Sequence, residues 1–189
     1  MSIILASASP RRQELLKQIG CDFMVMVSEV AEDNTAALSP VELATSLAAA
    51  KAADVAGKVT PADIVVGADT IVVLEGRVYG KPRDRAHACE MLTELAGRQH
   101  QVITGIAVAA GGQVLTDHCM TNVKIRALSD QEIADYVATG EPMDKAGAYA
   151  IQGIGALLVE GIDGCYPNVV GLPLVTLQKL LQTIRINLL

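Results

Sequence analysis

The chain has 189 residues and a net charge of −6, because 15 Lys and Arg face 21 Asp and Glu. This length is expected to give a single domain with a substantial core. That core must be mainly aliphatic, since 51% of the residues are hydrophobic but only 3% are aromatic. The acidic balance argues against the broad basic surface that nucleic-acid binding needs. A polyanionic ligand would therefore bind in a small local pocket, with a divalent cation.

The four cysteines are widely separated and show no Cys-x-x-Cys spacing. This spacing argues against a zinc site and a disulfide framework, and suits a reducing cytosol. No apolar run approaches membrane-spanning length, and the N-terminus lacks a signal-peptide pattern. We therefore expect a cytoplasmic protein that does not bind a membrane.

The first expected elements are a strand from Ile3 to Ala6 and a helix from Arg11 to about Ile19. Ser9 is a suitable N-cap for this helix. Arg11 and Arg12 lie in its first turn, where free backbone N–H groups already create a positive field. This combination favours an anion such as phosphate. The alternative is that both arginines are merely solvated.

A strand at Phe23–Val27, a loop at Ser28–Ser39 and a helix at Val41–Ala56 are expected next. Ser39, Pro40 and Glu42 have the order of a helix start: a cap, a first-position proline and an early acid. Lys51 interrupts the Ala-rich face of this helix. It either reaches out to solvent or has a functional role.

A β-branched run from Asp63 to Leu74 predicts a strand buried on both faces. Asp69 lies in its middle, where an unpaired carboxylate would cost several kcal/mol. The residue therefore either has a function, pairs with a buried Lys, or accepts backbone N–H groups. Gly67 would let a ligand approach the backbone, and Thr70 offers a hydroxyl for a base or a phosphate.

The rest of the chain continues the alternation of strands and helices. The expected elements are a hairpin strand at Arg77–Tyr79, a helix from Asp84 to about Ala96, strands at Gln101–Ala110 and Val114–Arg126, a helix from Ser129 to Thr139, short strands around Ala156–Ile162, and a last helix from about Pro173 to Ile186. Hairpins and crossovers both occur in this order. The chain therefore predicts an α/β fold with a mixed sheet.

Two loops carry polar groups. Lys81 follows the hairpin and can reach a phosphate as a point charge. The segment Gly140–Gly153 packs charged residues, a Tyr and a Gln between glycines, as loops that line sites often do. Glu141 could instead be a surface charge at a helix end, and Tyr149 a core residue with a satisfied hydroxyl. The three histidines show no ligand spacing and are expected to be surface or structural residues: His87, His100 and His118.

Four motifs together resemble the Maf family of nucleoside triphosphate pyrophosphatases, and the resemblance runs from the first strand to the last helix. They are Ser7–Leu16, which reads S-A-S-P-R-R-Q-E-L-L, with Gly67–Thr70, Gly80–Pro82 and Gly140–Gly147. Lys145, Tyr149 and Gln152 resemble the branch that acts on dTTP and UTP. The 7-methyl-GTP branch tends to have Cys in place of that lysine and lacks this Tyr and Gln.

The resemblance implies one Maf-like domain over residues 1–189, with a mixed, twisted β-sheet flanked by helices and two lobes around a deep cleft, as in ITPase-like proteins. It implies hydrolysis between the α- and β-phosphates, which releases the monophosphate and pyrophosphate with Mg²⁺ or Mn²⁺. Such a house-cleaning enzyme removes nucleotides, including modified ones. The implied partner is the nucleoside triphosphate, with no nucleic acid and no membrane. A homodimer is also implied, and the last helix, Leu172 to Leu189, is either its interface or core.

The family's functional positions match individual residues of this chain. Asp69 is the expected catalytic base, and Glu32 and Asp69 are the acids expected near the metal. The residues expected to bind substrate are Ser7, Lys51 and Lys81 at the phosphates and Arg12, Thr70 and Gln152 at the base. The physical chemistry agrees, since cleavage of a phosphoanhydride needs charge neutralisation and an oriented water.

Two alternatives remain open at this point. The chain could be a pyrophosphatase for another base, such as 7-methyl-GTP, or a non-catalytic nucleotide-binding regulator of cell division. A P-loop NTPase is disfavoured, because no G-x-x-x-x-G-K-[ST] motif is present.

Overall fold

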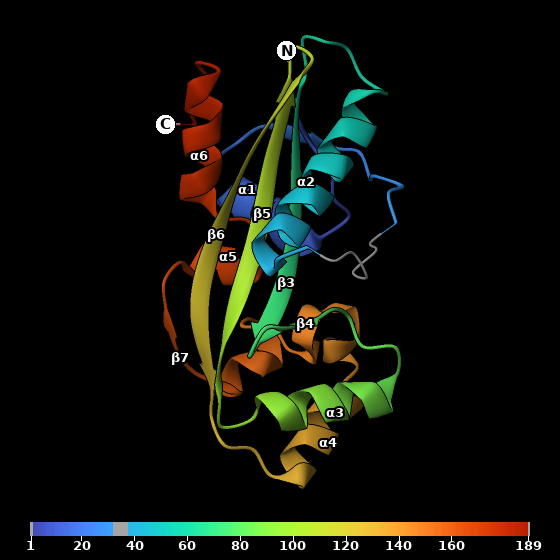
Figure 1. Ribbon diagram of the computed structural model, residues 1–189, viewed down its shortest axis with the longest axis vertical. Helices are drawn as coiled ribbons and strands as arrows, with labels where there is room; N and C mark the ends of the chain where they lie inside the picture. The colour runs from blue at the N-terminus through green and yellow to red at the C-terminus, as the bar shows by residue number, and fades with distance from the viewer. Residues whose placement is uncertain (1, 32–37, 189) are drawn as a thin grey trace. The chain divides into compact units, whose positions relative to one another are not determined.

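The computed structural model describes residues 2–31 and 38–188 and has strands and helices in alternation (Figure 1). The elements in chain order are β1 (Ile3–Leu5), α1 (Pro10–Gln18), β2 (Phe23–Val25), α2 (Pro40–Ala56), β3 (Ile64–Leu74), β4 (Arg77–Tyr79), α3 (Arg85–Leu95), β5 (Gln99–Ala110), β6 (Gln113–Ile125), α4 (Asp130–Ala138), the 3₁₀ helices η1 (Glu141–Asp144), η2 (Ala146–Ala148) and η3 (Gly153–Leu157), β7 (Val159–Asp163), α5 (Tyr166–Val170) and α6 (Leu174–Thr183).

The strands form a seven-stranded sheet in the order β2-β1-β3-β5-β6-β7, with β4 paired to β3. β1 runs parallel to β2 and β3, whereas the pairs β3–β4 and β6–β7 are antiparallel. The predicted α/β class with a mixed sheet is therefore confirmed. The chain divides into two compact units: unit 1 comprises Met1–Thr70, Thr104–Cys119 and Gly171–Leu189, and unit 2 comprises Ile71–Ile103 and Met120–Val170.

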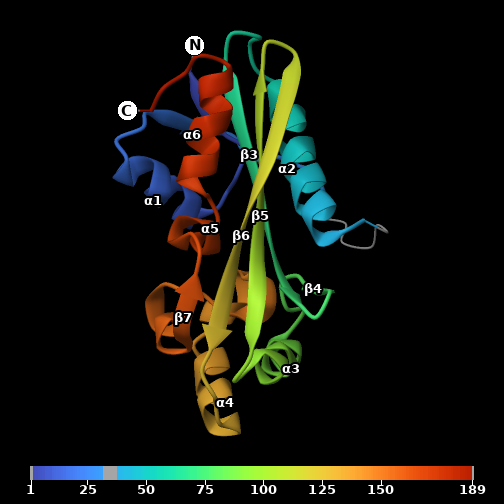
Figure 2. The same ribbon diagram turned by 60° about the vertical axis from the view of Figure 1, so that its left-hand side comes forward.

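In unit 1, α2 lies on one side of the strands and α1 and α6 lie on the other (Figure 2). α2 begins as its sequence predicts, because Ser39 and Glu42 form a reciprocal capping box. Small and branched apolar side chains of α2 and the strands make the core on this side: Ile4, Ala6, Ala48, Ala52, Val55, Val65, Ala107 and Ala109. α6 buries Leu177, Leu180 and Leu181, so one of its faces is core. A homodimer through this helix stays a prediction.

In unit 2, α3 and α4 pack against each other beside a second hydrophobic core (Figure 1). Its buried members include Val72, Leu92, Ile133, Tyr136 and Tyr149. Within residues 2–31 and 38–188, no helix has both the length and the apolar composition to cross a membrane.

Two segments differ from the sequence expectation. The segment from Gly140 to Gly155, expected to be mainly loop, contains η1, η2 and the start of η3. Strand structure expected around Ala156–Ile162 begins only at Val159, and α5 was not expected. The remaining elements begin and end within a few residues of their expected bounds.

Candidate active site

The approach of α2 to the sheet depends on two glycines, Gly67 in β3 and Gly105 in β5. A Cβ at Gly67 would lie 2.3 Å from the Ala48 carbonyl oxygen, and one at Gly105 would lie 2.2 Å from that of Ala44. Residues two apart in a strand share a face, as do residues three apart in a helix. Asp69 and Lys51 therefore meet where the helix backbone touches the sheet.

Lys51 and Asp69 form a buried ion pair, with 2.6 Å between Lys51 Nζ and Asp69 Oδ1. Their side chains are only 10% and 8% exposed. Lys51 thus does not reach out to solvent, and of the alternatives considered for Asp69, pairing with a buried Lys is the one observed. A pair of this kind is weak evidence for stability, because desolvation offsets much of its attraction. The lysine that pairs with Asp69 is also a candidate for binding phosphate.

Arg12 is held by three groups of unit 1 and is not merely solvated. Its Nε donates to the Gly171 carbonyl oxygen at 2.7 Å, its Nη1 to Ser7 Oγ at 3.0 Å, and its Nη2 to Thr70 Oγ1 at 3.0 Å. Thr70 Oγ1 also lies 3.0 Å from the hydroxyl of Thr104, which is fully buried. Three directed bonds fix the plane of the guanidinium, which a lysine could not reproduce.

The start of α1 differs in one detail from its prediction. Ser9 occupies the N-cap position, but among the described residues its side chain makes no capping bond. Its backbone N–H instead donates to Ser7 Oγ at 3.2 Å. The Ser7 hydroxyl therefore accepts from both Ser9 and Arg12 and links the helix start to the arginine.

Gly171 and Thr104 are the functional candidates that the sequence reasoning missed. Gly171 has φ of +122°, a region that favours glycine, and an added Cβ would contact both Arg12 Nε and Thr70 Oγ1 at 3.4 Å. Thr104 had a detectable signal, since it is a hydroxyl beside a glycine in an apolar strand. Gly171 had no such signal in the sequence, because its carbonyl oxygen accepts a bond from Arg12, which is 159 residues away in the chain.

The structure places the other expected site residues as follows. Lys81 is exposed and lies after β4 in unit 2. Gln152 is half-buried at the N-cap of η3, also in unit 2. Glu32 lies outside the described residues. The roles of these three residues in binding stay predictions.

The expected divalent metal has one described candidate ligand, Asp69. Within residues 2–31 and 38–188, no group of three His, Cys, Asp or Glu side chains is arranged to hold a metal ion. Mg²⁺ is commonly bound through one or two carboxylates together with substrate phosphates and water. The single buried carboxylate of Asp69 therefore fits a metal that binds together with a triphosphate, and does not fit a metal held by protein groups alone.

The segment after α4 is held by buried polar groups. The Tyr149 hydroxyl lies 2.6 Å from His100 Nε2, so Tyr149 is a core residue with a satisfied hydroxyl and His100 is structural, as expected. Burial lowers the pKa of His100 to about 4 and raises the pKa of Tyr149 above its usual value. Glu141 is half-buried and accepts bonds from Tyr136, Ile154 and Gly155, so the alternative that it is a surface charge at a helix end is wrong.

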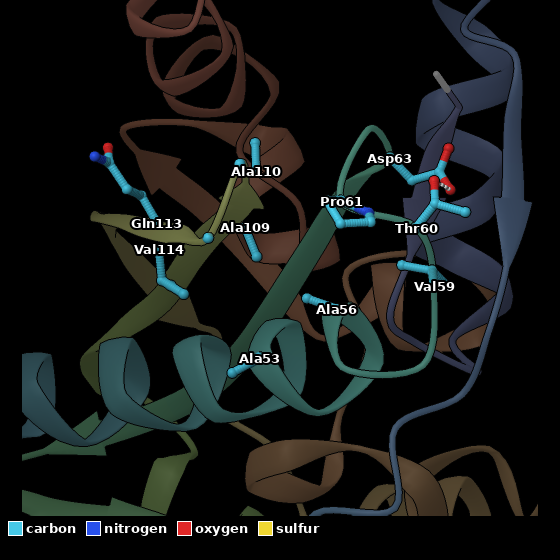
Figure 3. Close-up of a pocket in the computed structure, with 12 residues that line it drawn as sticks. Ala53, Ala56, Val59, Thr60, Pro61, Asp63, Ala109, Ala110, Gln113 and Val114 are labelled. Atoms are coloured by element: carbon cyan, nitrogen blue, oxygen red, sulfur yellow. Dashed lines mark hydrogen bonds between the residues drawn. The ribbon is translucent and has the colours of Figure 1, made fainter.

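A pocket of about 330 Å³ lies elsewhere in unit 1 (Figure 3). The twelve described residues that line it include no Lys or Arg. Its one carboxylate, that of Asp63, already accepts bonds from the Ser2 N–H and the Thr60 hydroxyl. Without cations, this pocket does not fit a triphosphate.

Fold and site together define an α/β protein with a mixed sheet that gathers a carboxylate, cations and hydroxyls, the groups that phosphate chemistry requires. Residues 2–184 match the family described as Maf-like protein, and the chain belongs to this family.

Relatives named dTTP/UTP pyrophosphatase are similar to the chain over almost its full length. The relative from Pelotomaculum thermopropionicum is 51% identical, over 99% of this chain and 98% of its own. The relative from Symbiobacterium thermophilum is 55% identical, over 95% and 93%. Among solved structures, the Staphylococcus aureus Ham1 protein is similar with a TM-score of 0.45 and 17% identity, covering 66% of this chain and 72% of that chain.

Proposed function

We propose that this protein hydrolyses dTTP and UTP between the α- and β-phosphates, releasing the nucleoside monophosphate and pyrophosphate. The observation that carries the proposal is the buried Lys51–Asp69 pair on β3. The next residue of the strand, Thr70, bonds Arg12, which also bonds Ser7. The relatives of about 50% identity that are named dTTP/UTP pyrophosphatase support the choice of substrate.

Asp69 acts on the attacking water. Only an ionised carboxylate can accept a proton from water, and here a cation lies against the carboxylate. Because Asp69 is buried, few other water molecules compete for its carboxylate. Its interaction with the attacking water is therefore stronger. Lys51 neutralises charge on the phosphates, because its ammonium group can turn from Asp69 to a phosphate oxygen.

Arg12, Ser7 and Thr70 form a pre-organised group that orients the nucleotide. The arginine is already fixed in one plane before substrate binds, so little side-chain entropy is lost on binding. Lys81 binds phosphate, and Gln152 contacts the nucleobase, since its amide can both donate to and accept from a uracil or thymine edge.

Mg²⁺ or Mn²⁺ would supply further charge neutralisation at the phosphates, and Asp69 is the described residue that would hold it. We also infer a cytoplasmic location. Among the described residues the four cysteines form no disulfide, as is usual for proteins of reducing compartments.

The test is pyrophosphate release from a panel of nucleoside triphosphates, with and without Mg²⁺ or Mn²⁺. We expect dTTP and UTP to be preferred, and Asp69→Asn to lose on the order of 10²-fold or more in kcat. Asp117→Asn is a matched control, because this half-exposed carboxylate accepts a bond from the backbone N–H of its neighbour His118.

An Asp69→Asn variant that is folded and retains the wild-type rate would falsify the role of Asp69. Preference for another base, such as 7-methyl-GTP, would contradict the proposed substrate. Nucleotide binding without turnover under either metal would favour a non-catalytic regulator instead.

A further inference from the structure

The segment that carries Gln152 is attached on both sides to a single pair of side chains, Tyr136 and Glu141. Before Gln152, the backbone N–H of Ala150 donates to the Tyr136 hydroxyl at 3.2 Å. After it, the N–H groups of Ile154 and Gly155 donate to Glu141 Oε2 and Oε1 at 3.0 and 2.9 Å.

Tyr136 and Glu141 are hydrogen-bonded to each other and lie close together in the sequence. The Tyr136 hydroxyl donates to Glu141 Oε1 at 2.9 Å. Tyr136 is fixed in the core at the end of α4, and Glu141 begins η1 five residues later. The Tyr136–Glu141 pair is thus a rigid support on which the backbone of residues 150–155 rests.

Two glycines let the backbone lie directly against this support. A Cβ at Gly153 would lie 2.6 Å from Glu141 Oε2, and φ at this glycine is +66°. A Cβ at Gly155 would lie 2.6 Å from the Tyr136 hydroxyl and 2.3 Å from the Ala150 carbonyl oxygen. Positions 153 and 155 therefore have no room for a side chain.

The Glu141 carboxylate accepts three hydrogen bonds, which favour its ionised form. Partial burial opposes its ionisation, but the N–H groups of Gly155 and Ile154 and the Tyr136 hydroxyl outweigh this effect, so the pKa of Glu141 is lowered. An ionised carboxylate only accepts hydrogen bonds, whereas the amide of a glutamine would turn one donor against another. The site therefore distinguishes glutamate from its nearest isostere.

We propose that Tyr136 and Glu141 are positioning residues that fix Gln152 for discrimination between nucleobases. The inference rests on the proposed function, because it assumes that Gln152 contacts the base. An amide distinguishes bases only when its donor and acceptor ends are held in a defined orientation. Neither Tyr136 nor Glu141 itself contacts substrate in this scheme.

The experiment compares Glu141→Gln, Tyr136→Phe and Gln152→Ala in the full-length protein. Steady-state kinetics on dTTP, UTP, dCTP and dGTP would give kcat and KM for each variant. Both positioning variants should raise KM for dTTP by roughly tenfold, as the loss of an oriented hydrogen bond implies, with kcat within about twofold. Glu160→Gln is the matched control, since its carboxylate is half-exposed and bonds Lys124.

If Glu141 had a purely structural role, Glu141→Gln would add a loss of its own to that of Gln152→Ala. If Glu141 acts through Gln152, the double variant Glu141→Gln with Gln152→Ala should discriminate no less than Gln152→Ala alone. Tyr136→Phe removes a single hydroxyl and serves as the milder test, so the inference stays testable if Glu141→Gln fails to fold.

Three results would overturn the inference: unchanged base discrimination in both positioning variants, an equal loss of kcat on every nucleotide, or unchanged discrimination in Gln152→Ala. Failure of the proposed function is separate from these, because it would be seen in the wild-type protein as no pyrophosphate release from dTTP or UTP.

Discussion

Gly67→Ala tests whether the close approach of α2 builds the site. The added Cβ would lie 2.3 Å from the Ala48 carbonyl oxygen and 2.9 Å from the Ala52 backbone nitrogen, and neither backbone atom can move by itself. Ordinary contact begins near 3.4 Å, so the helix must retreat by roughly 1 Å. The distance from Lys51 to Asp69, now 2.6 Å, would then exceed hydrogen-bond range.

A loss of stability and a loss of rate should follow from this displacement. Overpacking of a close-packed core costs about 1–3 kcal/mol in the free energy of unfolding. A displacement of about 1 Å in a catalytic group can cost about 10²-fold in rate. Urea unfolding would measure the first quantity, and pyrophosphate release from dTTP the second.

The control for this variant is Gly57→Ala, at the end of the same helix. Its Cβ would meet only ordinary contacts of 3.6 and 3.7 Å, and its φ of −67° is open to any residue. We expect its stability to stay within about 1 kcal/mol of wild type. If Gly67→Ala instead unfolds at the wild-type urea midpoint and turns over dTTP at the wild-type rate, the argument from close approach is wrong.

Three further variants test single contacts. Arg12→Lys should raise KM for dTTP by about tenfold, because one ammonium group cannot replace three directed bonds; unchanged kinetics would contradict this. Lys51→Met should cost about 3–5 kcal/mol in urea unfolding by leaving Asp69 buried without its cation, and a stabilised variant would refute the importance of the pair. His100 binds its proton near pH 4 when folded and near 6.5 when unfolded, so stability should be complete above pH 6.5 and fall by roughly 3 kcal/mol towards pH 4. His100→Gln should lose this part of the pH dependence in urea unfolding at pH 7 and pH 4, and a slope equal to that of wild type would refute the assignment.

The elements that the sequence predicted well are those with local signals. The capping box at Ser39 and the β-branched run of β3 need only neighbouring residues to be recognised. Such features depend on backbone propensity and periodicity, which any short window of sequence contains.

The Gly140–Gly155 segment was not predicted, because its order depends on distant partners. Glu141 bonds backbone groups 13 and 14 residues away, and Tyr149 bonds a histidine 49 residues away. A window of neighbouring residues holds glycines and charges here, which favour a loop. Only tertiary contacts reveal that Gly153 fits against the Glu141 carboxylate and Gly155 against the Tyr136 hydroxyl.

The sequence identified several residues of the candidate site, but not which of them contact one another. Asp69 and Lys51 each stand out as a charge within an apolar element. Arg12 stands out as a cation in the first turn of a helix and Thr70 as a hydroxyl in a buried strand, and the family resemblance added Ser7. That Lys51 pairs with Asp69, whereas Arg12 bonds the next residue, depends on which face of β3 each side chain occupies.

The register of β3 therefore matters as much as its composition. Successive strand residues point to opposite faces, so a slip of one position would exchange Asp69 with Thr70. Parallel pairing of Leu5 with Val66 sets the native register, and Gly67 reinforces it. In a slipped strand, Val66 or Ala68 would face Ala48 with a Cβ where the helix backbone leaves no space. Gly67, which allows α2 to pack closely on the sheet, therefore also favours the register in which Asp69 pairs with Lys51.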